Sequence, residues 1–145
     1  MDYLPLLEMH LKSDEIIDLL ETYDMEVVYE FDRLHENLPD EYQARCAELG
    51  LELLFDADQR LKTVFIHLVD ANGFTPADLT DSDVLRFDTK RAAASHALRE
   101  GIAVKEGRSE FLGKETDWIR FEYEGYSVHY EYRRGSLALI TLTAS

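Results

Sequence analysis

The stretch DWIRFEYEGYSVHYEYRRGSLALITLT, residues 117–143, decides the fold of this chain. Its apolar residues recur at every second position, first over residues 119–123 and again over residues 126–132. The pair Glu124-Gly125 between them suits a two-residue hairpin turn, because glycine readily adopts a positive φ. Alternation between glycine turns is typical of antiparallel strands. We therefore predict a three-stranded meander, with a second turn at 133–136 and a last strand over 137–143.

The first forty residues predict helices followed by a strand. Leucines at helical spacing predict a helix over residues 3–11. Ser13 is a suitable N-cap for a second helix over residues 14–23, whose apolar side chains form one stripe. The β-branched and aromatic residues 25–31 predict a strand, and residues 34–39 a loop.

The middle of the chain predicts a helix and a hairpin. Asp40 is placed to cap a helix that runs through Ala47 and ends at Gly50. Residues 51–55 and 61–69 predict the two arms of a hairpin. The second arm is apolar on both faces, which is typical of a strand at the centre of a sheet.

The segment before the meander predicts one clear helix. Residues 70–83 are rich in turn-forming residues and predict a loop, followed by a short strand over 84–87. Asp88 is placed to cap an alanine-rich helix over 89–100. Residues 103–116 are polar, and we expect them to form a mobile connection.

These elements predict a single α+β domain over residues 1–145. We expect an antiparallel sheet of about five or six strands, with the helices packed mainly on one face. The length suits one domain, and an apolar content of 46% predicts a folded protein. The start carries no basic leader and no long apolar run, so we expect no secretory signal and no membrane span. A single cysteine, Cys46, suits a cytoplasmic location.

Acidic residues give the chain a formal net charge of −15 and are unevenly distributed. The net charge is −11 over residues 1–42, −5 over residues 43–83 and +1 over residues 84–145. A chain of this charge is repelled by phosphate backbones, so we expect no direct binding to nucleic acid. Two interpretations of the acidity stay open: a docking face that attracts a basic partner, or charge that keeps the protein in solution.

The sequence carries no recognisable metal or nucleotide motif. Residues 56–58 suggest the start of a calcium loop, but Arg60, Leu61 and His67 occupy positions that require an oxygen ligand, a glycine and a glutamate. The histidines and the single cysteine show no zinc-binding spacing. No phosphate-binding loop and no nucleophile elbow is present. We therefore expect neither a metal nor a cofactor.

One group of residues keeps an enzyme as an alternative. His129 and Glu131 share a face of one predicted strand, and we expect Arg120 across the hairpin. Such neighbours can orient an imidazole for acid–base catalysis. The same side chains also suit a polar cross-strand network on the wet face of a sheet.

Aromatic residues of the meander are candidates for contacts with a partner. Tyrosine and tryptophan beside charged residues are typical of protein-binding patches, although some of these side chains must fill the core. The candidate anchors are Trp118, Tyr126 and Tyr130.

Several motifs follow one another along nearly the whole chain: LKSDEIIDLL, VYEFDRL, GLELLFDADQRLKTVFIHL, RFDTKRAAASHAL, DWIRFEYEGYSVHYEY and GSLALITL. Their order resembles a family of small bacterial proteins linked to polymorphic-toxin and interbacterial-competition loci, whose members look like immunity proteins. The chain departs from that pattern at residues 98–101, where the family often has a Leu-Gly-Pro turn. The resemblance implies a cytoplasmic toxin inhibitor and carries no catalytic residues.

An immunity role implies a basic partner, because a nuclease toxin must be basic to hold phosphate. An acidic inhibitor could occupy the same cleft and would associate rapidly. The acidic residues expected at the interface are Asp14, Glu15, Asp18 and Glu21 of the second helix, then Asp78, Asp81 and Asp83. Alternatives are an adaptor or chaperone for a secreted effector, and a small enzyme that uses His129 and Glu131. The oligomeric state stays open.

Overall fold

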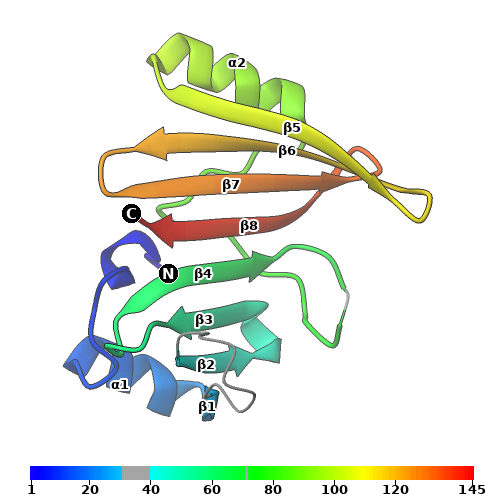
Figure 1. Cartoon of the computed structure of the whole chain (residues 1–145). Coiled ribbons are helices and arrows are strands. Elements are labelled where there is room, and N and C mark those ends of the chain that lie inside the picture. The colour runs from blue at the N-terminus through cyan, green and yellow to red at the C-terminus, as the bar shows by residue number, and fades with distance from the viewer. Residues whose placement is uncertain (31–39, 71) are drawn as a thin grey trace.

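The protein forms one eight-stranded antiparallel sheet with two α-helices (Figure 1). The computed structural model describes residues 1–30, 40–70 and 72–145, so the loop predicted over 34–39 lies outside the described residues. The strands lie in the order β1-β2-β3-β4-β8-β7-β6-β5, so β1 and β5 form the two edges. The prediction of five or six strands was therefore too low. Among the described residues, no helix is long and apolar enough to span a membrane.

The bounds of the elements follow the chain. The helices are α1 (Asp14–Thr22) and α2 (Lys90–Glu100), with short 3-10 turns η1 (Leu4–Leu6) and η2 (Ala47–Leu49). The strands are β1 (Val27–Glu30), β2 (Glu41–Cys46), β3 (Leu51–Phe55), β4 (Leu61–His67), β5 (Ala103–Phe111), β6 (Lys114–Tyr123), β7 (Tyr126–Arg133) and β8 (Ser136–Ala144). Strands β6, β7 and β8 confirm the predicted meander, and β3 and β4 the predicted hairpin.

The helix predicted over residues 3–11 was wrong beyond its first turn. Glu8 adopts a positive φ of 71°, which ends any helix. The Glu8 N–H donates to the Leu61 carbonyl (2.7 Å), and the Leu61 N–H donates to the Met9 carbonyl (2.9 Å). The backbone thus pairs with the start of β4 instead of with itself. The predicted helix over 14–23 is α1, although the Ser13 hydroxyl makes no cap hydrogen bond.

The helix predicted between Asp40 and Ala47 was also wrong, because this segment is strand β2. Ala44 and Cys46 are buried, whereas Arg45 between them is exposed. This period of two belongs to a strand. β2 pairs with β1 on one side and β3 on the other, and these pairings outweigh the helical preference of its residues. Gly50 does adopt the predicted left-handed conformation, with φ 62°, but it follows η2.

The predictions before the meander need three corrections. Residues 103–111, expected to be a mobile connection, form strand β5 and pair with β6 over nine consecutive residues. Residues 84–87 form no strand. α2 starts at Lys90, and its N-cap is Thr89 rather than Asp88, because the Thr89 hydroxyl accepts the Ala92 N–H at 3.1 Å.

One face of the sheet carries the core. Inward side chains of neighbouring strands meet in register, as in the series Leu53, Val64, Leu142 and Val128. The helices add buried residues to the same cluster: Ile16 from α1, and Ala93 and Ala97 from α2. Phe121 on β6 lies beside His96 of α2, with ring centroids 6.3 Å apart.

The other face of the sheet, which we name the open face, carries the alternate side chains of the strands. Most of these residues are half-buried rather than buried. Its central members are Glu52, Leu54, Thr63, Phe65, His67, Trp118, Arg120, His129, Glu131, Leu139 and Thr141. The sheet therefore has one face that is packed and one face that mixes apolar, aromatic and charged groups.

Candidate functional site

The strongest candidate for a binding surface is the outer side of α1, which we name the α1 acidic face. It consists of Asp14, Glu15, Asp18 and Glu21, and all four side chains are exposed. The apolar stripe of the same helix turns inward, with Ile16 fully buried. Because the helix must bury that stripe, its carboxylates are directed to solvent. None of the four forms an ion pair with another residue that the structure describes.

The charge pattern of α1 opposes the stability of the helix. The helix DEIIDLLET contains four acids and no base. Asp14 and Asp18 are four residues apart, a spacing at which like charges repel. Glu21 lies in the last turn, where the helix dipole disfavours an acid. Helix stability therefore explains the acids of the first turn and leaves Asp18 and Glu21 unexplained.

Exposed apolar residues lie next to this acidic face. Tyr23 ends α1 with 39% of its surface exposed, although the sequence placed it in the inward stripe. On β1, Val28 and Tyr29 are 51% and 45% exposed. Figure 1 shows α1 beside the β1 edge of the sheet. The combination of carboxylates with exposed tyrosines is typical of a protein-binding surface.

The acids predicted in the loop over 70–83 have different roles. Asp83 is half-buried, and its two carboxylate oxygens accept the N–H groups of Tyr3 and Leu4, each at 2.9 Å. It therefore anchors the start of the chain. Asp78 is exposed, and its carboxylate accepts the Thr80 N–H at 2.9 Å. Hydrogen bonding from the side chain of Thr80, and then from its backbone, lowers the pKa of Asp78. Asp81 is exposed.

The predicted aromatic anchors do not share one surface. Tyr130 is buried, 2% exposed, and donates its hydroxyl to the Leu85 carbonyl at 2.9 Å, so its side chain belongs to the core. Tyr126 is half-buried at the edge of the core face and stacks on Tyr123 at 4.8 Å. Trp118 lies on the open face. Since α1 packs on the opposite face, Trp118 does not join the α1 acidic face.

The three residues predicted to form an acid–base site, His129, Glu131 and Arg120, make their contacts with other side chains. His129 stacks on the Trp118 ring with centroids 5.1 Å apart. The Glu131 carboxylate accepts hydrogen bonds from Arg133, and Arg120 donates to Glu122 at 2.8 Å. Burial lowers the pKa of His129, with Arg120 acting in the same direction and Glu131 against it. Neither charged neighbour therefore orients the imidazole directly.

A second histidine, which the sequence placed only in the rejected calcium loop, binds a carboxylate on the open face. His67 Nε2 lies 2.7 Å from a Glu52 carboxylate oxygen. The His67 ring stacks on the Phe74 ring with centroids 4.0 Å apart. The Arg45 guanidinium also lies over the Phe74 ring, 4.6 Å from its centroid. The predicted 51–55 and 61–69 hairpin contained the signal, because its register puts Glu52 and His67 on one face.

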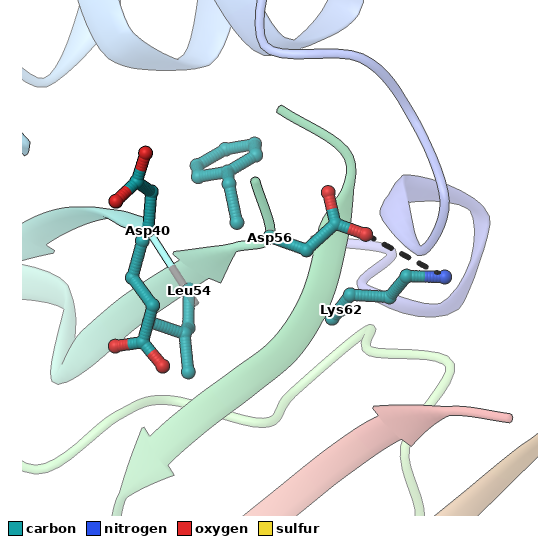
Figure 2. A pocket seen from close by; sticks show the side chains of 6 residues that line it. Asp40, Leu54, Asp56 and Lys62 are labelled. Atoms are coloured by element: carbon teal, nitrogen blue, oxygen red, sulfur yellow. Dashed lines mark ion pairs between the residues drawn. The ribbon is translucent and has the colours of Figure 1, made fainter. Parts of the chain in front are cut away.

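The structure also contains a pocket of about 110 Å³ where β3 ends and β4 begins. Its lining residues are Asp40, Glu41, Leu54, Phe55, Asp56 and Lys62. Figure 2 shows the carboxylates of Asp40 and Asp56 well apart, with Lys62 paired to Asp56 at 4.0 Å. Asp40 already accepts the Tyr29 hydroxyl at 2.7 Å. In the described ranges, no three His, Cys, Asp or Glu side chains are arranged to hold a metal ion.

Comparison of the chain with protein-family models, curated proteins and solved structures finds no match. The resemblance to immunity proteins therefore stays a prediction.

Proposed function

We propose that this protein binds a basic protein partner through the α1 acidic face. The observation that carries the proposal is that Asp18 and Glu21 are exposed, unpaired within the described residues and unfavourable for the helix that bears them. Charges that cost stability are retained when another function needs them. The role expected from the resemblance is inhibition of a toxin in the cytoplasm.

Electrostatics supports a fast-associating inhibitor. Residues 1–42, which include α1 and β1, carry a net charge of −11. A concentrated negative field accelerates the approach of a basic partner and weakens with added salt. The carboxylates would occupy positions where a nuclease holds phosphates, and exposed Tyr23 would contribute apolar contact beside them. Inhibition would then follow from occlusion of the partner's cleft.

The test is affinity capture from the native lysate with three tagged forms of the protein. The first is the wild type. The second reverses the α1 acidic face with Asp14→Lys, Asp18→Lys and Glu21→Lys. The matched control makes the same change of charge elsewhere, with Glu48→Lys, Asp58→Lys and Glu124→Lys, all of which are exposed.

We expect the wild type and the control to retain one dominant basic protein, and the α1 variant to lose it. Co-expression then separates the roles: an inhibitor restores growth to cells that make the captured protein, whereas an adaptor does not. Equal capture by all three forms would show that the interface lies elsewhere. Absence of any stable partner at low and high salt would refute the proposal.

A further inference from the structure

Strand β5 is an edge strand with one side open. It pairs with β6 over nine residues without a bulge, and it contains no proline. Its residues are exposed except for Gly107, which is half-buried, and the side chain of residue 111, which is not described. In an antiparallel ladder, alternate residues direct their N–H and C=O groups away from the neighbouring strand. β5 therefore presents a row of backbone donors and acceptors to a further strand.

The charges of β5 favour one antiparallel register for pairing with the β5 strand of a second copy. Charged residues on an edge usually prevent pairing. Here Lys105, Glu106, Arg108 and Glu110 carry mixed signs, so the outcome depends on the register. Two antiparallel copies centred on Gly107 place Glu106 opposite Arg108 twice, and Lys105 opposite Ser109 twice. Opposite charges in cross-strand positions are stabilising.

The other symmetric registers are worse. Centres at Lys105, Glu106, Arg108 or Glu110 each place a charged residue opposite itself, which is destabilising. A centre at Ser109 pairs opposite charges but overlaps only residues 107–111 of the two strands. The Gly107 register alone uses all nine residues of β5 and brings no like charges together. Within the described chain, Glu106 forms no ion pair and is free to meet a second copy.

The long-range charges permit approach at this edge. A chain of net charge −15 repels its copy, yet residues 84–145 carry a net charge of +1. The acidic α1 and β1 lie at the opposite edge of the eight-stranded sheet. Seven strand spacings of about 4.8 Å separate the two edges by roughly 34 Å. That separation exceeds the screening length of about 8 Å at physiological salt.

We propose that two copies of this chain associate through β5, in the antiparallel register centred on Gly107, and form one continuous sheet. The indole of Trp118 lies against Gly107, so close that a Cβ at this glycine would be 2.6 Å from the ring. The two Trp118 rings would therefore lie beside the two-fold axis on the open face. The interface is independent of the α1 acidic face and leaves it exposed at both ends of the dimer.

Cysteine cross-linking tests the register. Lys105→Cys and Ser109→Cys are made as separate variants at exposed positions, where folding is not at risk, and the native Cys46 is buried. We expect mild oxidation of an equal mixture to give a disulfide-linked dimer, because positions 105 and 109 of two copies are opposite one another. Each variant oxidised alone should give far less dimer. Equal cross-linking in all three samples would overturn the register.

Sedimentation of the wild-type protein tests association itself. We expect a concentration-dependent monomer–dimer equilibrium, accompanied by a change in the fluorescence of Trp118, the single tryptophan. Glu106→Arg should raise the dimer dissociation constant about tenfold, because it places arginines opposite one another in both halves of the interface. Glu124→Arg, an equal charge change in an exposed turn, serves as the control. A wild-type protein that remains monomeric from micromolar to millimolar concentration would refute the proposal.

Discussion

Gly107 shows how the absence of one side chain organises the open face. It is the register partner of Trp118, and a Cβ built on it would lie 2.6 to 2.8 Å from three atoms of the indole. The Trp118 indole can therefore lie against the backbone of β5. The His129 ring stacks on the indole, with ring centroids 5.1 Å apart. An aromatic side chain that covers a glycine on a neighbouring strand offsets the weak packing of that glycine.

The first prediction concerns this contact. Gly107→Ala should lower the free energy of unfolding by about 1–3 kcal/mol, because the indole must move to admit the methyl group. Urea unfolding followed by Trp118 fluorescence measures the change. In a Trp118→Val background the same alanine should cost much less, and the double-mutant cycle isolates the contact. An equal cost in both backgrounds would contradict the steric explanation.

The second prediction is a pH dependence carried by His129. Burial lowers the pKa of this imidazole below its ordinary value of 6.5, so the unfolded chain binds the proton more readily than the folded chain. The neutral ring therefore contributes its full stability above the pKa of the unfolded state. This contribution is lost as the pH falls through the lower pKa of the folded state. The midpoint temperature of thermal unfolding should therefore fall between about pH 7 and about pH 5 in the wild type, and should fall less in His129→Gln. Parallel curves would contradict it.

At the scale of elements, two tyrosines hold a segment that has no regular structure of its own. Tyr130 and Tyr132 of β7 donate their hydroxyls to the carbonyls of Leu85 and Phe87, at 2.9 and 2.8 Å. Burial raises the pKa of both hydroxyls, so they remain protonated donors. Residues 84–87 thereby pass under the core face and position the start of α2.

The third prediction follows from these two hydrogen bonds. Tyr130→Phe and Tyr132→Phe should each lower the free energy of unfolding by about 1 kcal/mol, since each leaves a partly buried carbonyl without its donor. Hydrogen exchange should show faster opening at the start of α2 in the double variant than in the wild type. Tyr126→Phe is the control, because Tyr126 is half-buried and its hydroxyl makes no hydrogen bond within the described residues. Unchanged exchange in α2 would contradict the positioning role.

The fourth prediction concerns the start of the chain. Asp83 accepts two backbone N–H groups from Tyr3 and Leu4, and Tyr3 is 4% exposed. Asp83→Ala should cost about 1.5–3 kcal/mol of unfolding free energy, because hydrogen bonds to a charged group are lost. Limited proteolysis should then cut near residues 1–8 earlier than in the wild type. Asp81→Asn, in the same loop, should leave both measurements unchanged, because Asp81 is exposed and asparagine tolerates its positive φ of 59°.

At the scale of the whole molecule, charge is unevenly distributed between the two edges of the sheet. The acids concentrate at the β1 edge and the balanced charges at the β5 edge.

The fifth prediction concerns an acid at the β1 edge. Glu21→Lys should raise the free energy of unfolding by about 0.3–1 kcal/mol, since a base in the last turn suits the helix dipole. The same variant should weaken capture of the basic partner. Loss of stability together with loss of binding would indicate a structural role for Glu21 instead.

Local patterns in the sequence determined the meander, the hairpin of β3 and β4, and α1 with its acidic face. In each of these, the period of the apolar residues and the turn residues agree, so no distant partner is needed to choose the structure. The exposure of Asp14, Asp18 and Glu21 follows directly from the inward stripe of the same helix.

Strands β2 and β5 depend on pairing with other segments of the folded chain. Residues 41–46 became a strand because β1 and β3 flank them, and residues 103–111 because β6 offers a partner along their whole length. The burial of Tyr130 and the anchoring by Asp83 likewise depend on residues 45 and about 80 positions away. Pairing with distant strands and burial under distant segments are non-local free energies, and they leave no periodic trace in the short stretches that they organise.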